Sequence, residues 1–249
     1  MSAKHIYFAS DFHLGVPTLE KSHEREKRIC RWLDSIKPTC AELFLVGDLF
    51  DFWWEYKYTV PKGTVRLLGK IAEFTDAGIP VHFFVGNHDL WMKDYFVKEL
   101  GVSVHHQSIE RTFAGKKFMI GHGDGLGPGD YWYKLLRKIF ASKFLQWCYS
   151  RLHPNLAFYI ARGSSRRSKE GSAEKDAIFL GKEKEWLYQY CGELQKKEFR
   201  HYYIFGHRHL PLELELEQGA RYINLGDWIQ YNTYAVFNGS DLKLLKFEG

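Results

Sequence analysis

Five short apolar runs in the sequence each end in a motif built from aspartate, asparagine or histidine. The motifs are Asp11-Phe12-His13, Asp48-Leu49-Phe50-Asp51, Asn87-His88-Asp89, His122-Gly123-Asp124 and His207-Arg208-His209. One such motif could be an ordinary turn, because Asn, Asp and Gly are common turn residues. Five of one chemical kind predict a shared site instead. Oxygen and imidazole ligands without cysteine suit Mn, Fe or Zn better than a soft metal.

The spacing within the motifs favours a site for two metal ions. Asp11 and His13 are two residues apart, as are His207 and His209. At the end of a strand, side chains two residues apart can share one face. A carboxylate has two oxygens and can bridge two cations, and Asp48 is the candidate for this role. Two-metal sites hold both the attacking and the leaving oxygen of phosphoryl transfer, so the pattern indicates phosphoester chemistry.

The elements that position these motifs are predicted by the hydrophobic pattern. Apolar runs precede the motifs at residues 5–10, 42–47, 81–86, 117–121 and 202–206. Helix-compatible stretches at 20–36 and 63–76 separate the first three runs, and such strand-helix-strand units predict a parallel sheet covered by helices. Open α/β sheets place their ligands at the carboxyl ends of the strands. We therefore expect the five motifs to meet at that edge.

The rest of the chain predicts further strands and one insertion. Two runs joined by Ala114-Gly115 predict a hairpin, and further strands are expected at 102–106, 212–217, 221–226, 233–237 and 242–247. LELELE at 212–217 alternates strictly, which is typical of a half-buried strand. From Asp130 to Glu198 apolar and basic residues interleave at helical spacing, with another helical stretch at 174–197. We therefore predict a core formed by 1–129 and 199–249, with a helical insertion at 130–198.

Composition narrows the functional class. The 249 residues are 45% hydrophobic and 17% aromatic, and the formal net charge of +5 does not by itself imply nucleic acid. The four cysteines show no Cys-x-x-Cys spacing, which argues against a disulfide framework or a thiolate metal site. The N-terminus lacks the pattern of a signal peptide, and charged residues interrupt every apolar stretch. We expect a cytoplasmic protein.

The ordered blocks DFH, GDLFD, GNHD, GHGD and GHRH resemble the five-block signature of calcineurin-like metallophosphoesterases, and they span nearly the whole chain. The resemblance implies a four-layer α/β/β/α sandwich with a helical lid and two divalent metal ions, with Mn as the expected metal. One ion would be held by Asp11, His13, Asp48 and His209. The other would be held by Asp48, Asn87, His122 and His207. His88, paired with Asp89, would be catalytic and face the phosphate.

Three further aspartates fall within the same blocks. We expect Asp51, Asp89 and Asp124 to hydrogen-bond to ligand imidazoles and to fix their tautomers.

The insertion resembles the lid of bacterial UDP-2,3-diacylglucosamine pyrophosphohydrolases in its place after GHGD, its aromatic and basic face and the string SKEGSAEK at 168–175. Those enzymes split a nucleotide-linked, diacylated sugar to UMP and the acylated sugar phosphate of lipid A synthesis. The resemblance implies substrate contacts from Asn87, Asp130, Ser168, Lys175 and His207. It also implies peripheral association with the inner membrane. No nucleic-acid partner is expected, because the basic residues of the insertion are interleaved with Leu, Ile and Phe, which suits lipid better. No obligate protein partner is evident.

The apolar residues of the insertion allow two interpretations. They are Trp132, Leu135, Leu136, Ile139, Phe140, Phe144, Leu145, Trp147 and Phe158. Interleaved with lysine and arginine, they suit acyl chains and an anionic membrane surface. They would equally serve to pack the insertion onto the core, and the two roles are compatible on different faces.

The sequence departs from this family at two motifs. It reads GNHD where many of these lipid enzymes carry Arg after the Asn, and GHRHLP where they carry GHTHRP. These differences indicate a divergent branch. The alternatives are a soluble phosphomonoesterase or nucleotide phosphodiesterase of the same superfamily, and a scaffold that has lost the chemistry. The scaffold predicts broken metal blocks, whereas all five are intact.

Overall fold

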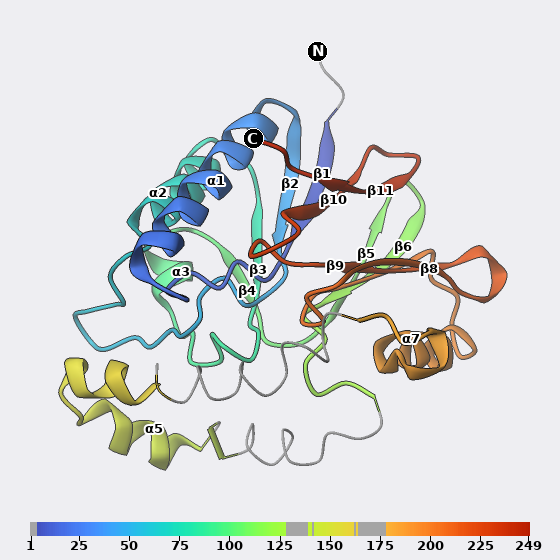
Figure 1. Ribbon diagram of the computed structural model, residues 1–249. Coiled ribbons are helices and arrows are strands. Elements are labelled where there is room, and N and C mark those ends of the chain that lie inside the picture. Colours follow the sequence, from blue (N-terminus) through green and yellow to red (C-terminus); the bar gives the residue numbers. More distant parts are fainter. Residues whose placement is uncertain (1–3, 128–138, 141, 162, 164–177) are drawn as a thin grey trace.

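Two mixed β-sheets face each other in the computed structural model, which describes residues 4–127, 139–140, 142–161, 163 and 178–249 (Figure 1). The first sheet has the strand order β11 (Leu242–Lys246), β10 (Thr233–Phe237), β1 (His5–Ala9), β2 (Cys40–Leu45), β3 (Val81–Phe84) and β4 (Ser103–His105). Strands β1 to β4 are parallel, and β10 and β11 are antiparallel additions beside β1. The predicted parallel sheet in the first half of the chain is confirmed.

The second sheet has the strand order β5 (Ile109–Phe113), β6 (Lys116–Gly121), β7 (Tyr202–Phe205), β9 (Arg221–Leu225) and β8 (Pro211–Glu215). Strands β6, β7 and β9 are parallel, and β5 and β8 are antiparallel edges. The predicted hairpin is formed by β5 and β6. In β8, Leu212 is buried and Glu213 is exposed, as the alternating pattern predicted.

Helices cover the outer face of each sheet (Figure 1). The first sheet is covered by α1 (Leu19–Ile36), α2 (Val65–Asp76) and α3 (Tyr95–Lys98), and the second by α7 (Trp186–Gln195). Helix α1 begins after Thr18, whose side chain accepts a hydrogen bond from the Lys21 N–H. Its apolar residues recur along one side, which packs on the sheet: Ile29, Trp32, Leu33 and Ile36.

Three apolar clusters lie between the layers. The cluster between α1, α2 and the first sheet includes Trp32, Leu43, Leu67 and Phe83. The cluster between the two sheets includes Phe8, Phe44, Phe118, Ile204 and Ile223. The cluster beneath α7 includes Leu187, Cys191, Tyr203 and Tyr222. These three interfaces separate four layers, so the predicted α/β/β/α sandwich is confirmed.

The predicted helical stretch at 174–197 is too long. Helix α7 begins only at Trp186, after a short 3-10 helix, η2 (Lys182–Lys184). Gly181 precedes η2 with a φ of 95°, a left-handed value that a continuous α-helix does not contain. Upstream in the predicted insertion, α5 (Lys143–Ser150) and residues 154–161 are helical. Among the described residues, no helix combines the length and the apolar composition needed to cross a bilayer.

Candidate metal centre

The candidate ligands of both sheets converge at the carboxyl ends of the strands. They follow β1 (Asp11, His13), β2 (Asp48), β3 (Asn87, His88), β6 (His122) and β7 (His207, His209). Among the described residues, three groups of side chains have ligand atoms within 4.8 Å of one another. Two of them share Asp48, and the third consists of His13, Asp51 and His88. The sheet edge expected from the sequence is therefore where these residues meet.

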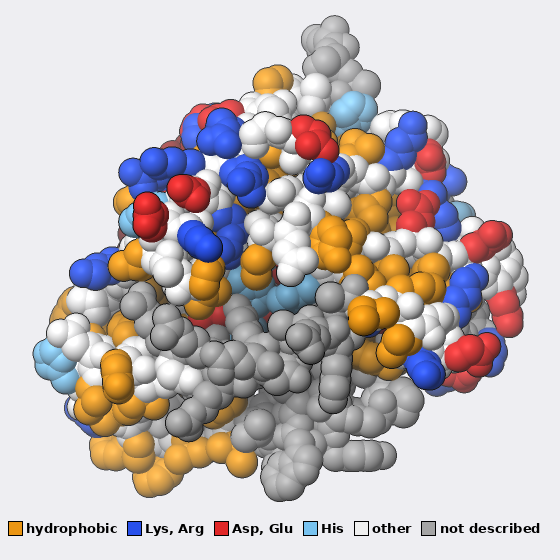
Figure 2. Space-filling view, in the orientation of Figure 1, with side chains coloured by type: hydrophobic (Ala, Val, Ile, Leu, Met, Phe, Trp, Pro, Cys, Tyr) orange, Lys and Arg blue, Asp and Glu red, His pale blue; other side chains and the backbone are white. Residues whose placement is uncertain are grey.

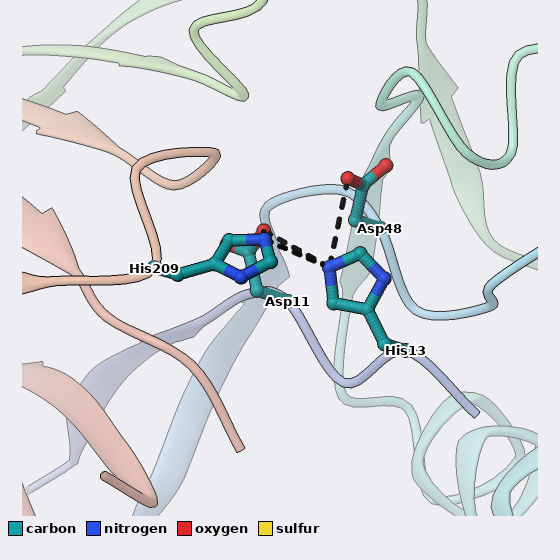
Figure 3. A group of neighbouring side chains, drawn as sticks. All are labelled: Asp11, His13, Asp48 and His209. Atoms are coloured by element: carbon teal, nitrogen blue, oxygen red, sulfur yellow. Dashed lines mark hydrogen bonds and ion pairs between the residues drawn. The ribbon is translucent and has the colours of Figure 1, made fainter. Parts of the chain in front are cut away.

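The first group consists of Asp11, His13, Asp48 and His209 (Figure 3). His13 Nε2 lies 3.6 Å from Asp11 Oδ1 and 3.8 Å from Asp48 Oδ2. His209 Nε2 lies 3.0 Å from His13 Nε2 and 3.3 Å from Asp11 Oδ1. Figure 3 shows the two imidazoles and the two carboxylates turned toward one another from the loops after β1, β2 and β7. This arrangement offers two nitrogen and two oxygen ligands to one cation.

The second group consists of Asp48, His122 and His207, with Asn87 beside them. His122 Nε2 lies 3.3 Å from Asp48 Oδ2. Asn87 Oδ1 lies 3.3 Å from His122 Nε2 and 2.8 Å from His207 Nδ1. Since Asp48 Oδ2 also faces His13, this carboxylate lies between the two groups. The buried clusters are therefore consistent with a dinuclear metal site.

Each aspartate uses one oxygen for the backbone and directs the other into the centre. Asp11 Oδ2 accepts a hydrogen bond of 3.0 Å from the His207 N–H, and Asp48 Oδ1 accepts one of 2.9 Å from the His88 N–H. Within the described residues, Asp11 Oδ1 and Asp48 Oδ2 are buried and accept no hydrogen bond. A buried carboxylate oxygen in that state is unfavourable unless positive charge lies beside it. The donor set therefore fits a bound cation.

The tautomer of His122 supports the same conclusion. His122 Nδ1 lies 2.8 Å from Val46 O, and because a carbonyl only accepts, this nitrogen carries the hydrogen. In the neutral ring Nε2 then directs its lone pair at Asp48 Oδ2. Two electron-rich atoms at this distance repel unless a proton or a cation lies between them.

The pKa shifts of His122 and Asp48 show that positive charge is stabilised at the second group. Burial lowers the pKa of His122, but the carboxylates of Asp48, Asp11 and Asp124 together outweigh burial and raise it well above its usual value. Burial raises the pKa of Asp48, but the charges of His122 and His88 and the hydrogen bonds from these residues together lower it. For His207, burial and the charge of His122 lower the pKa, which favours the neutral ring that a metal ligand requires.

Most of the candidate ligands have strained backbone conformations. The φ angles are positive at Asp11 (56°), His13 (44°), Asp48 (53°), His207 (68°) and His209 (56°). Residues other than glycine seldom adopt this region, and where they do they cluster at functional sites. The strain lies at the residues that turn the chain directly after β1, β2 and β7.

Two glycines give the carboxylates room. A Cβ at Gly86 would lie 2.2 Å from Asp48 Oδ1, and a Cβ at Gly206 would lie 2.6 Å from Asp11 Oδ2. These are the two oxygens that the backbone N–H groups hold. Glycine at the end of β3 therefore gives room to Asp48 from the adjacent strand β2, and glycine at the end of β7 gives room to Asp11 from the facing sheet.

His88 lies against the first group, and its pairing differs from the prediction. Its ring meets that of His13 edge to face, with centroids 4.8 Å apart. The sequence predicted a pair with Asp89, and this is wrong. His88 Nδ1 instead lies 2.8 Å from Asp51 O and 3.7 Å from Asp51 Oδ1. Asp51 is thus the acidic residue beside His88.

Asp89 supports the backbone of the site. Its buried carboxylate accepts hydrogen bonds of 2.6 Å from the Gly86 N–H and 2.9 Å from the Leu49 N–H. The chain turns back after His88, so the carboxylate closes this turn and joins it to the loop after β2. The expectation that Asp89 would hydrogen-bond to a ligand imidazole is therefore also wrong. Burial and the charge of Asp48 raise the pKa of Asp89 well above its usual value.

The sequence reasoning missed Asp227, which lies behind His209. Asp227 Oδ2 is 3.9 Å from His209 Nδ1, and Asp227 Oδ1 accepts hydrogen bonds from the N–H groups of residues 229–231. A signal for it was present, because NLGDW places Gly-Asp directly after β9, as VGDL does after β2.

Two of the predicted substrate contacts, Asn87 and His207, lie in the second group. The other three, Asp130, Ser168 and Lys175, lie outside the described residues, as do Trp132, Leu135 and Leu136.

Part of the insertion is docked on the loops that carry the site. Tyr149 packs against Trp54 and Trp91, with ring centroids 4.7 and 5.3 Å apart. Phe158 packs against Phe52 at 5.5 Å, and Trp91 Nε1 donates a hydrogen bond of 2.9 Å to Phe140 O. These contacts join the insertion to the chain just after Asp51 and Asp89.

Other apolar residues of the insertion face solvent. Phe144 is 69% exposed and Trp147 is 54% exposed, with the Arg151 guanidinium 5.0 Å from the Trp147 ring. Further exposed side chains are Leu145, Leu156, Tyr159, Ile160, Ile178, Phe179 and Leu180. Apolar side chains gather below the grey segments in Figure 2. Some apolar residues of the insertion therefore pack on the core and others face solvent, which supports both the packing and the membrane interpretation.

Comparison with known proteins points to the same chemistry. Residues 4–211 match the family model described as calcineurin-like phosphoesterase. The chain is 37% identical to a UDP-2,3-diacylglucosamine hydrolase of Porphyromonas gingivalis, over 98% of this chain and 97% of that protein. It is 26% identical to the hydrolase of that name from Shewanella putrefaciens, over 96% of each. A crystal structure of Vps29 from Entamoeba histolytica with Zn²⁺ aligns with 96% of this chain and 89% of its own at 13% identity and a TM-score of 0.44, a likeness too weak to bear on function.

Proposed function

Because the chain belongs to the calcineurin-like phosphoesterase family, we propose that it hydrolyses UDP-2,3-diacylglucosamine to UMP and 2,3-diacylglucosamine 1-phosphate. The substrate assignment rests on the 37% identity, over 98% of the chain, to a relative named UDP-2,3-diacylglucosamine hydrolase. The converging carboxylates and imidazoles support the reaction type.

Seven residues are proposed to hold two divalent ions, with Mn as the expected metal. Asp11, His13, Asp48 and His209 would bind one ion, and Asp48, Asn87, His122 and His207 the other. When bound, two such ions supply positive charge for the phosphoryl oxygens and activate the attacking water. The protein holds their ligands in place through the backbone contacts to Asp11, Asp48 and His122.

His88 is proposed to contact the phosphoryl group. Its Nδ1 carries the hydrogen, because Asp51 O at 2.8 Å can only accept. The ring is thereby oriented, and Nε2 is left for the substrate. A protonated Nε2 would donate to a phosphoryl oxygen as negative charge develops there. Asp51 acts as the residue that positions His88, and Asp89 as the residue that positions the turn.

The diacylated sugar is proposed to lie under the insertion. The aromatic contacts of Phe52, Trp91 and Tyr149 place the insertion next to the metal loops. Asp130, Ser168 and Lys175 are proposed to contact the sugar phosphate. The exposed Phe144 and Trp147, with nearby basic residues, are proposed to rest on the cytoplasmic face of the inner membrane. We place the insertion at 130–198, with α7 at its C-terminal end packed on the core.

The nucleotide half is proposed to occupy a cavity beside the second group. The cavity has a volume of about 460 Å³ and reaches His122. Its lining includes the polar residues His105, Gln107 and Ser108 and the aromatic residue Tyr190. A planar base that stacks and hydrogen-bonds along its edge fits this lining.

The test is product analysis with purified protein. UDP-2,3-diacylglucosamine and its form without acyl chains are supplied to metal-loaded and chelated protein. The proposal requires metal-dependent UMP and acylated sugar phosphate, with the diacylated substrate strongly preferred. Equal rates on the two substrates would favour a soluble nucleotide phosphodiesterase, and release of inorganic phosphate from monoesters alone would favour a phosphomonoesterase.

A further inference from the structure

We infer that Arg25, on the buried side of α1, is a positioning residue that holds the His13 end of the metal centre. The inference rests on the proposed metal site, and it concerns a residue outside all five motifs.

The guanidinium of Arg25 donates to three carbonyls of one turn. Nη1 lies 2.8 Å from Phe12 O and 2.8 Å from His13 O, and Nη2 lies 2.6 Å from Val16 O. Arg25 is only 5% exposed, which is unusual for an arginine. A planar fork of N–H donors can satisfy several carbonyls at once, which the single ammonium of lysine cannot do in the same geometry.

The contacts fix the peptide of a candidate ligand from both sides. The His13 N–H donates a hydrogen bond of 3.0 Å to Asp48 O, while the His13 carbonyl accepts from Arg25. His13 has a φ of 44°, a conformation that needs support from its surroundings. The Gly15 N–H in the same turn donates to Ser22 Oγ at 2.7 Å, so α1 holds this turn at two points.

The positive charge of Arg25 also interacts with carboxylates beside the site. Burial lowers its pKa, and the charges of Asp227 and Asp51 act in the opposite direction. These are the two carboxylates that lie beside His209 and His88. Arg25 is thus a buried cation whose charge acts on the carboxylates beside the first group.

The test measures metal binding by the full-length protein. Wild type, Arg25→Met, Arg25→Lys and Arg28→Met are stripped with chelator and titrated with Mn²⁺ by equilibrium dialysis and metal analysis. Arg28 is the matched control, because it lies one turn along α1 and donates to Asn232 Oδ1 at 3.1 Å. Thermal midpoints and circular dichroism confirm that each variant is folded at the temperature of the titration.

Wild type is expected to bind two ions. Arg25→Met should lower the affinity for one of the two ions by about tenfold or more, the range typical of residues that orient metal ligands. Arg28→Met should keep both affinities within about twofold of wild type. The Mn²⁺ affinity of Arg25→Lys should lie between those of wild type and Arg25→Met. This variant provides the test if Arg25→Met does not fold.

Two results separate this inference from the proposed function. A folded Arg25→Lys or Arg25→Met protein that binds both ions as wild type does, even with a lower thermal midpoint, would show a purely structural role and overturn the inference alone. A wild-type protein that binds no Mn²⁺ would overturn the two-metal proposal together with it.

Discussion

Gly86→Ala adds a single methyl group and should disable the centre. The added Cβ would lie 2.2 Å from Asp48 Oδ1, 2.8 Å from Asp48 N and 2.9 Å from Asp48 Cγ. Ordinary contact needs about 3.4 Å, so either the end of β3 or the Asp48 carboxylate has to move by about 1 Å. The move would also disturb the 2.9 Å hydrogen bond between the His88 N–H and Asp48 Oδ1.

A displacement of about 1 Å at a catalytic site can lower the rate by about a hundredfold, which corresponds to about 2.7 kcal/mol of transition-state stabilisation. The assay is kcat/KM for a small chromogenic phosphodiester, together with Mn content after dialysis. The matched control is Gly69→Ala in α2, where no atom lies within 4 Å of the new Cβ. That variant should keep full activity and gain up to about 1 kcal/mol in stability. A Gly86→Ala protein with both ions and at least a third of wild-type activity would refute the reasoning.

Three further predictions follow from other parts of the molecule. Asp48→Ala should lose both ions, whereas His209→Gln should retain the second, so metal analysis giving equal stoichiometry for the two variants would contradict a shared Asp48. Phe144→Glu should reduce sedimentation with anionic vesicles, whereas Glu at the exposed Val65 of α2 (Val65→Glu) should not; equal sedimentation of the two variants would contradict the membrane proposal. Burial, with a smaller effect of the His82 charge, lowers the pKa of His105 from 6.5 to about 4. The stability that the neutral ring contributes is present above pH 6.5 and is lost as the pH falls toward 4. The free energy of unfolding, measured by denaturant titration at several pH values, should therefore fall less steeply between pH 6.5 and 4 in His105→Gln than in wild type. An unchanged dependence on pH would contradict the lowered pKa of His105.

The sequence predicted the layers and the meeting point of the ligands because both depend on local patterns. An apolar run that ends in Asp48 or His122 shows the strand and the position of its carboxyl end at once. The parallel order of β1 to β4 in one sheet, and of β6, β7 and β9 in the other, then brings such ends together. Asp227 follows the same rule, and the Gly-Asp after β9 was sufficient to find it.

The contacts that depend on turns and on distant packing could not be predicted in this way. His88 and Asp89 are adjacent in the sequence, but the turn directs Asp89 to the Gly86 N–H, and His88 is left beside Asp51, 37 positions away in the chain. Arg25 contacts a turn 9 to 13 residues upstream, and a helical pattern alone gives no reason to place a guanidinium there. Such contacts require the three-dimensional arrangement of α1 over the loop.

Hydrolysis of UDP-2,3-diacylglucosamine in heavy-oxygen water tests the central claim most directly. Mn-loaded protein and a chelated control are incubated with substrate, and both products are examined by mass spectrometry. We propose that water attacks the phosphorus next to uridine, which places the solvent oxygen on UMP. The account therefore predicts labelled UMP, unlabelled 2,3-diacylglucosamine 1-phosphate and no product in the control. Label confined to the sugar phosphate would contradict the proposed site of attack. Equal product with and without metal, or no UMP at all, would contradict the proposed function itself.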